Sequence, residues 1–427
     1  MAMLRYVASI MVCPICLRTP MRHIRSFACL LLLVTGAATL NLHCASTSPP
    51  ADVGSAETAP QRPAYTLLVH HADSLRLHDL VPRTASEETG PALRARPPRL
   101  LRTGVASVKQ HVPAPARNAV AFTYTTPDSV HLARYARGAN RIQPVDGQAR
   151  PATYSVAWHP ERDAFAYGVY TPTAKGNRGP GTIRIAEGDT TRSVGCSASS
   201  EVLAWTADAQ LSVRNDDTLY LVSSRDCATQ ARLDVRRHHH MTYDASGAYL
   251  AYIYRELEYN RDADAYQPDS SLYVGNAAGA NETRLFGDDR APRQAAWAPE
   301  TPELAVSVSE DNARRLVLYN AAEERTTFLI PPATAPEGAQ RHPRWSPDNS
   351  TVAFTLAADT VNAAVYQANT TTVLRRVTGP AWGWIDAQTL VVPTPDGLAL
   401  VRPDDRLLHA LPPETALIGG WPAPPVR

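Results

Sequence analysis

The stretch RWSPDNSTVAFT, Arg344 to Thr355, contains the repeating unit that determines the fold. Its second half, TVAFT, is rich in β-branched and aromatic residues and predicts a strand. In SPDN, Pro347 presets one backbone angle, and the Asp and Asn that follow accept the conformations of a tight turn. The unit is therefore a strand that ends in Trp345, a turn, and a second strand.

The same unit recurs along the chain. Five other aromatic residues occupy the position of Trp345, and Pro113 occupies it in a degenerate copy; the five are Trp158, Trp205, Tyr243, Trp297 and Trp384. We call these seven residues the anchors. Successive anchors lie 38 to 54 residues apart. Self-similarity with a period of roughly 20–50 residues indicates an array of supersecondary units.

Each copy contains enough sequence for four short strands, which is one propeller blade. After VAFTL, for example, come AAVYQ and TVLRR. Near the C-terminus ALIGGWPAP supplies a first strand with Trp421, and YTLLVHHADSLRLHDL (65–80) supplies later strands without an anchor. Together they complete one split blade. We therefore predict an all-β propeller of four-stranded blades over residues 63–427, with eight blades, or seven if residues 63–105 are irregular.

Two segments between the predicted strands differ from the repeat. Residues 84–102, TASEETGPALRARPPRLLR, are expected to be a loop insertion. Residues 254–273 form an acidic insertion, which we expect to be a solvated loop. Asp262, Asp264 and Asp269 in this segment could bind calcium, but the loop lacks the glycine and terminal glutamate of an EF-hand.

The repeat resembles that of the TolB-like group of β-propellers, which belong to the WD40-like Pro-Asp repeat proteins. Repeats of that group carry a W-S-P-D-G turn followed by an L-A-F strand. Trp345-Ser346-Pro347-Asp348 and Val352-Ala353-Phe354 are the best match, and the resemblance extends from about residue 63 onward. It implies the propeller fold and an envelope protein, whereas a fold alone does not define a function.

The composition excludes several classes of function. The chain has 427 residues, a formal net charge of +1 and 44% hydrophobic residues. Such a balance does not favour a nucleic-acid partner, since phosphate backbones are bound by basic surfaces. The sequence also contains no G-x-S-x-G, H-E-x-x-H, P-loop or dinucleotide-binding motif.

The N-terminus is expected to direct export. The basic segment MRHIR precedes a 14-residue apolar run, Phe27 to Leu40, which is too short to span a bilayer and is typical of a secretory signal. We assign residues 1–43 to this signal, with Met21 as an alternative start, and residues 44–62 to a flexible tether. Cys44 after the apolar run resembles the lipidated cysteine of bacterial lipoproteins. Cleavage after Ala38 would instead release a soluble secreted protein.

The predicted propeller contains two cysteines, Cys196 and Cys227. Export into an oxidising compartment makes a disulfide between them plausible. Their spacing alone does not show that they meet.

Polar residues three positions before the anchors are expected to approach the central channel, because side chains alternate along the innermost strand. These candidate ligand-binding residues are Gln110, Ser155, His240, Gln294 and His342. His240 and His342 occupy equivalent positions in blades two apart. They could hold a divalent metal, as in oligogalacturonate lyases of similar fold, or they could simply bind the backbone.

Two functions follow from these patterns. The first is a non-enzymatic, TolB-like scaffold in the periplasm or on the outer membrane, without a cofactor. It would be a monomer that binds an envelope protein or peptide and touches the membrane only through its lipid anchor. The alternative is a metal-dependent lyase or hydrolase that acts on a saccharide, with His240 and His342 as ligands of one channel metal.

Overall fold

The computed structural model describes residues 63–422 except for short gaps, which are residues 84–90, 116–117, 140, 173–177, 197–200, 207–209, 216, 236–237, 261–264, 287–289, 311–312, 359, 368–369 and 375–382. The predicted signal, the tether and Cys44 lie outside the described residues. The described part contains no helix with the length and hydrophobicity needed to span a bilayer. Its one helix is the 3-10 turn η1, Pro332–Thr334.

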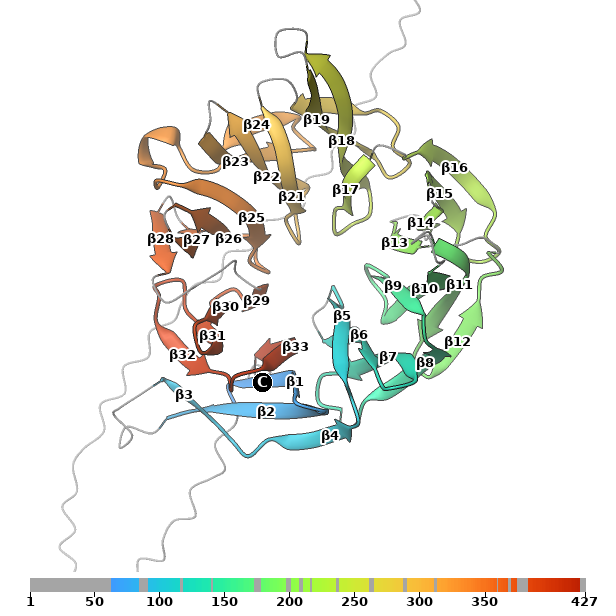
Figure 1. The fold of residues 1–427 in the computed structure, drawn as a ribbon, viewed down its shortest axis with the longest axis vertical. Helices are drawn as coiled ribbons and strands as arrows, with labels where there is room; N and C mark the ends of the chain where they lie inside the picture. The colour runs from blue at the N-terminus through green and yellow to red at the C-terminus, as the bar shows by residue number, and fades with distance from the viewer. Residues whose placement is uncertain are drawn as a thin grey trace, which may run out of the picture. The chain divides into compact units, whose positions relative to one another are not determined.

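Eight antiparallel sheets surround a common axis (Figure 1), which confirms the prediction of an eight-bladed all-β propeller. The first three uninterrupted blades are β5(Ser107–Pro113), β6(Ala119–Thr125), β7(Ser129–Ala136), β8(Gln143–Ala149); β9(Thr153–Trp158), β10(Ala164–Pro172), β11(Arg178–Glu187), β12(Thr190–Ser193); and β13(Glu201–Trp205), β14(Gln210–Asn215), β15(Thr218–Ser223), β16(Thr229–Asp234).

The next four blades repeat this order. They are β17(His238–Tyr243), β18(Tyr249–Asn260), β19(Ala265–Asn276), β20(Thr283–Phe286); β21(Ala291–Trp297), β22(Glu303–Glu310), β23(Ala313–Asn320), β24(Arg325–Phe328); β25(Ala339–Trp345), β26(Thr351–Ala357), β27(Val361–Gln367), β28(Thr370–Leu374); and β29(Gly383–Asp386), β30(Thr389–Thr394), β31(Gly397–Val401), β32(Leu407–Ala410). The first strand of each blade faces the centre of the ring (Figure 1).

The eighth blade is split between the two ends of the described chain, as predicted. It contains β1(Tyr65–His71), β2(Ser74–Pro82), β3(Leu93–Ala95), β4(Arg99–Thr103) and the inner strand β33(Thr415–Pro422). Strand β33 pairs antiparallel with β1 and thereby closes the ring.

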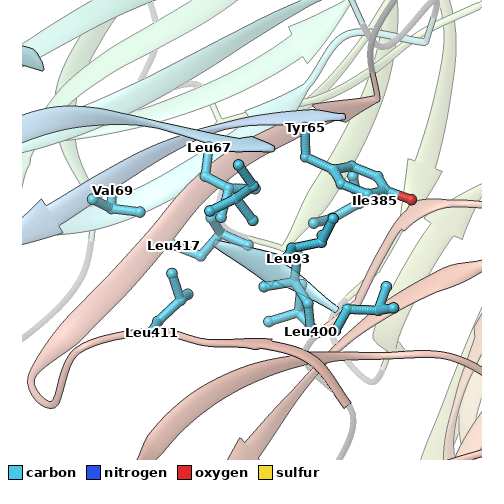
Figure 2. Packing of buried hydrophobic residues seen from close by; sticks show 11 residues of the cluster. Tyr65, Leu67, Val69, Leu93, Ile385, Leu400, Leu411 and Leu417 are labelled. Atoms are coloured by element: carbon cyan, nitrogen blue, oxygen red, sulfur yellow. The ribbon is translucent and has the colours of Figure 1, made fainter. Parts of the chain in front are cut away.

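A hydrophobic cluster joins this blade to the β29–β32 blade (Figure 2). Leu67, Ile385 and Leu417 are each less than 5% exposed in it, and Tyr65 donates or accepts a 2.8 Å hydrogen bond with Thr389 Oγ1. Burying side chains of this size stabilises the contact by roughly 1.5–3 kcal/mol each. The closure therefore rests on packing as well as on the strand pairing.

The turn after each anchor is built by the residue that follows the anchor. In six blades the backbone N–H of that residue donates to a carbonyl at the start of the second strand; the donors are Ala114, His159, Thr206, Asp244, Ala298 and Ser346. In the SPDN copy, Ser346 is fully buried and its Oγ accepts the Thr351 N–H at 3.0 Å. Asp348 accepts hydrogen bonds from Ser346 and Ser350. The Pro-Asp turn therefore connects the innermost strand to the second strand, as the sequence predicted.

The expectation of a loop over residues 84–102 is wrong for its described second half. Residues 93–95 and 99–103 form β3 and β4, and both pair with β2 as the outer strand of the split blade. Pro97 and Pro98 lie between them and interrupt the strand, since proline lacks the N–H that a ladder requires.

The acidic insertion is also not a loop over most of its length. Strands β18 and β19 continue their ladder to Asn260↔Ala265, beyond the Tyr254 end of the pairing with β17. The insertion is thus a two-stranded ribbon that extends from its blade (Figure 1). Asp262 and Asp264 lie outside the described residues.

Cys196 and Cys227 form a disulfide, and their Cα atoms are 5.4 Å apart. Cys196 follows β12 and Cys227 lies between β15 and β16, so the bond joins two neighbouring blades.

Candidate functional site

The predicted channel residues lie on inner strands that are bulged. Seven of the eight inner strands skip at least one residue in the ladder to their second strand, and β9 is the continuous one. Each bulge removes backbone groups from the ladder and bends the strand locally. The freed N–H groups must find other partners.

Two predicted ligand-binding residues accept N–H groups at or directly beside these bulges. Ser155 Oγ accepts the Val202 N–H at 2.8 Å, and Gln294 Oε1 accepts the His342 N–H at 2.8 Å. In both cases the acceptor and the donor stand three residues before the anchors of adjacent blades. These side chains therefore connect neighbouring inner strands. Whether they also bind a ligand remains a prediction.

His240 and His342 have the equivalent geometry that their positions predicted. Each is skipped in its ladder, and both adopt the left-handed region, with φ of 48° and 50°. His240 is exposed, whereas His342 is half-buried with Nδ1 3.3 Å from Thr355 Oγ1. Burial lowers the pKa of His342, and Arg344, Arg341 and Arg314 lower it further.

The described residues contain no group of three or more His, Cys, Asp or Glu side chains arranged to hold a metal ion. Among the described residues, no His, Cys, Asp or Glu side chain thus serves as a third ligand for a metal held by His240 and His342. Gln294, another of the predicted ligand-binding residues, accepts the backbone N–H of His342 through its side-chain oxygen.

A pocket of about 880 Å³ opens where the inner strands β5, β9 and β13 begin. Its lining combines hydroxyl, amide and charged groups from three consecutive blades, among them Ser107, Lys109, Gln110, Thr123, Thr125, Arg150, Ser155 and Glu201. We call it the polar pocket. It brings together Gln110 and Ser155, two of the predicted site residues, but neither His240 nor His342.

A second pocket, of about 430 Å³, lies where inner strands end, on the four consecutive blades of β25, β29, β33 and β5. It is lined by three tryptophans of the repeat, by inner-strand glycines and by His111, and we call it the tryptophan pocket; the aromatic and glycine residues are Trp345, Trp384, Trp421, Gly383, Gly419 and Gly420. A Cβ atom at Gly383 would meet nothing within 4 Å. Burial lowers the pKa of His111.

The polar pocket contains charged residues that were not among the predicted site residues. The predicted residues stand three positions before their anchors, whereas Lys109 and Glu201 stand four positions before theirs. Aligning that column would have shown Lys109, Glu201, Arg293 and Arg341 together. The tryptophan pocket carries no such signal, since packing tryptophans and pocket-lining tryptophans have the same spacing.

No protein-family model matches the chain, and no curated protein matches it. Solved structures that resemble it include the β-propeller domain of the Trilobed protease from Pyrococcus furiosus, with 12% identity, coverage of 72% of this chain and 99% of that chain, and a TM-score of 0.47. TolB from Acinetobacter baumannii has 13% identity, 83% coverage of both chains and a TM-score of 0.37. The acylaminoacyl peptidase of Pyrococcus horikoshii has 12% identity, coverage of 71% and 52%, and a TM-score of 0.47.

These likenesses concern the fold alone. The class of protein is given by the chain's own strand topology, which is that of an eight-bladed, all-β propeller with one blade split between its ends.

Proposed function

We propose that this protein is a non-enzymatic binding scaffold of the bacterial cell envelope, exported and anchored through a lipid on Cys44. Its partner is an envelope protein that inserts a polar, extended segment into the polar pocket. The observation that carries the proposal is the size and chemistry of this pocket. About 880 Å³ lies within the range of known ligand sites, which is roughly 300–1,000 Å³.

The lining of the pocket supports a peptide as the ligand. The lining includes the hydroxyl residues Ser107, Thr123 and Thr125 and the amide of Gln110. Ser107 Oγ and Thr125 Oγ1 are hydrogen-bonded to each other at 2.9 Å, which uses one donor and leaves the pair with further lone pairs and a second hydroxyl hydrogen. Together with the Gln110 amide the lining therefore contains both donors and acceptors, as an extended backbone requires. Lys109 and Arg150 stand with Glu201 in the same lining, so side chains of either charge would find a counter-charge. Loops and strand ends held by a rigid scaffold are a common place for such binding.

A site-specific crosslink tests the proposal in the full chain. A photoreactive amino acid at the exposed position of Lys109 should give one discrete adduct in intact cell envelopes. The same probe at Thr327, on the exposed outer strand β24, is the matched control and should give no such adduct.

A second variant links the adduct to the pocket. Ala106 is exposed and lines the pocket, so Ala106→Trp places a large ring there without overpacking the blade. It should abolish the Lys109 adduct while the variant keeps the melting temperature of a folded propeller. An adduct of unchanged yield in folded Ala106→Trp, or equal adducts at Lys109 and Thr327, would contradict the proposal.

A further inference from the structure

Three arginines gather on two neighbouring blades, away from both pockets. Arg293 lies on β21, Arg314 on β23 and Arg341 on β25. Figure 1 shows these strands on adjacent blades. Arg293 and Arg341 stand four residues before the anchors Trp297 and Trp345, so they occupy the same place near the start of each inner strand. We call these residues the arginine cluster.

Hydrogen bonds of Gln340 hold the strands of the cluster together. Gln340 Oε1 accepts the Leu316 N–H at 2.9 Å, and its backbone oxygen accepts the Ser307 hydroxyl at 2.7 Å. Leu316 is two residues from Arg314 on β23, so the two side chains share one side of the strand. The Leu316 side chain belongs to a buried cluster with Phe354 and Leu356 of the next blade. The side of β23 that carries Arg314 thus faces the blade that contains Arg341.

Arg341 and Arg293 act electrostatically on Arg314. The pKa of Arg314 is lowered by burial first and then by Arg341 and Arg293. No carboxylate offsets these effects on Arg314 within the described residues. Glu310 at the end of β22 is paired with Arg290 at 2.6 Å. The cluster is therefore a concentration of positive charge without a counter-charge from the described part of the chain.

The cluster also contains buried donors without acceptors. Arg293 Nε and Arg341 Nε are buried and make no hydrogen bond among the described residues. The same holds for Gln340 Nε2, and Gln340 is only 1% exposed. Leaving a buried donor unsatisfied is unfavourable, and more so for charged groups. An acceptor that carries negative charge would satisfy these donors and offset the repulsion between the arginines.

We propose that Arg293, Arg314 and Arg341 form a binding site for a multiply charged oxyanion, borne by a small molecule as a phosphate group or as clustered carboxylates. Guanidinium forks match the geometry of such oxygens and can bind them through two parallel hydrogen bonds. This site is separate from the polar pocket, and the inference does not rest on the proposed function.

Anion binding to the full chain tests the inference directly. Pyrophosphate, inorganic phosphate and citrate are titrated calorimetrically, and sodium chloride at matched ionic strength serves as the control for general screening. We expect saturable binding of at least one anion, and a higher melting temperature in its presence. Phosphate or pyrophosphate binding without citrate binding assigns the site to phosphate groups, and the reverse assigns it to carboxylates.

Substitutions locate the site. Arg314→Gln and Arg341→Gln should each weaken binding roughly tenfold to a hundredfold, the loss expected for charge-assisted hydrogen bonds. Arg314→Lys keeps the charge without the fork and should weaken binding less. Arg325→Gln, which removes an exposed arginine paired with Glu323, is the matched control and should leave binding unchanged.

Three results would overturn the inference. One is the absence of saturable binding in the wild-type chain at millimolar anion. Another is equal stabilisation by sodium chloride. The third is unchanged affinity in Arg314→Gln and Arg341→Gln variants whose circular dichroism matches that of the wild type.

Discussion

The indole nitrogen of Trp345 donates a 3.0 Å hydrogen bond to the carbonyl oxygen of Ala296 in the preceding blade. Ala296 is the residue before the anchor Trp297. The same relation connects three other anchors to the blade before them, with Trp158 bound to Val112, Trp297 to Thr242 and Trp384 to Arg344. Four of the anchors are also at most 9% exposed; they are Trp158, Trp205, Trp345 and Trp384. The repeated tryptophan is thus a packing residue, and in the four blades with this hydrogen bond it also connects the blade to the one before it.

Trp205 provides a natural contrast, since its Nε1 is buried without a hydrogen-bond partner among the described residues. Trp345→Phe removes a hydrogen bond and leaves the Ala296 carbonyl without its donor, whereas Trp205→Phe removes a donor that has no acceptor. We expect Trp345→Phe to lower the free energy of unfolding by about 1–2 kcal/mol more than Trp205→Phe does. Urea unfolding of both variants measures the difference, and equal losses would show that the hydrogen bond contributes nothing.

Acid should destabilise the propeller before its carboxylates are protonated. Burial lowers the pKa of His78 and of His409 on the adjoining blade. For His78, the charges of His409, Arg76 and His71 lower the pKa further and Asp79 opposes them. For His409, a hydrogen bond with the backbone of Leu93 opposes the effect of burial and Arg83 adds to it. Between the ordinary histidine pKa of about 6.5 and these lowered values, the unfolded chain binds more protons than the folded one. The free energy of unfolding therefore falls as the pH decreases below about 6.5.

Melting temperatures from pH 7.5 to 5 test this expectation. The double variant His78→Gln with His409→Gln should lose less stability over this range than the wild type, because it lacks two of the groups that must be kept neutral in the folded state. Parallel curves for the two proteins would contradict the assignment.

Reduction should weaken the join between two blades. The Cys196–Cys227 disulfide spans 31 residues, and cross-links of this length stabilise folded proteins by roughly 2–4 kcal/mol. Dithiothreitol should therefore lower the melting temperature of the wild-type chain to that of Cys196→Ser with Cys227→Ser. The double variant should not respond to the reductant, and a response of equal size would assign the effect to other cysteines.

The scaffold and the metal-dependent enzyme predict opposite metal contents for the purified chain. If the protein is a non-enzymatic scaffold, the purified chain should hold no stoichiometric divalent metal after dialysis against metal-containing buffer. Elemental analysis of the wild type and of His240→Ala with His342→Ala gives the answer. A stoichiometric ion in the wild type that disappears in the double variant would favour the saccharide-acting enzyme.

Lipid anchoring makes Cys44 the residue that decides where the protein is found. Cys44→Ala should move the protein from the membrane fraction to the soluble fraction and abolish labelling by a fatty-acid analogue. The disulfide variant Cys196→Ser with Cys227→Ser is the control and should remain labelled. A Cys44→Ala protein that stays in the membrane fraction would support another mode of attachment.

The elements predicted from the sequence are those that local chemistry determines. Ser346 and Asp348 build their turn from contacts within five residues, so the turn, the anchor and the flanking strands are all visible in a short stretch. The ribbon of β18 and β19 was missed because its acidic and polar residues lack the alternation of a half-buried strand. It is formed by its own cross-strand ladder, without the inner strand beside it.

The candidate site was predictable only in part, because it depends on bulges. The equivalence of His240 and His342 follows from their distance to the anchors. That Gln294 would accept the His342 N–H could not be foreseen, since the donor becomes available only where the ladder skips His342. The arginine cluster likewise combines residues from strands of two blades, and its members are far apart in the sequence.

The pairing of β1 with β33 also sets the order in which the ring can be completed. Among the described strands, β1 is the first to leave the ribosome and β33 is the last. Until β33 arrives, one edge of β1 is unpaired and able to template a strand from another copy of the chain. A chain that is cut before Thr415 would keep that edge permanently exposed, so loss of a single terminal strand would convert a closed ring into an aggregation-prone one.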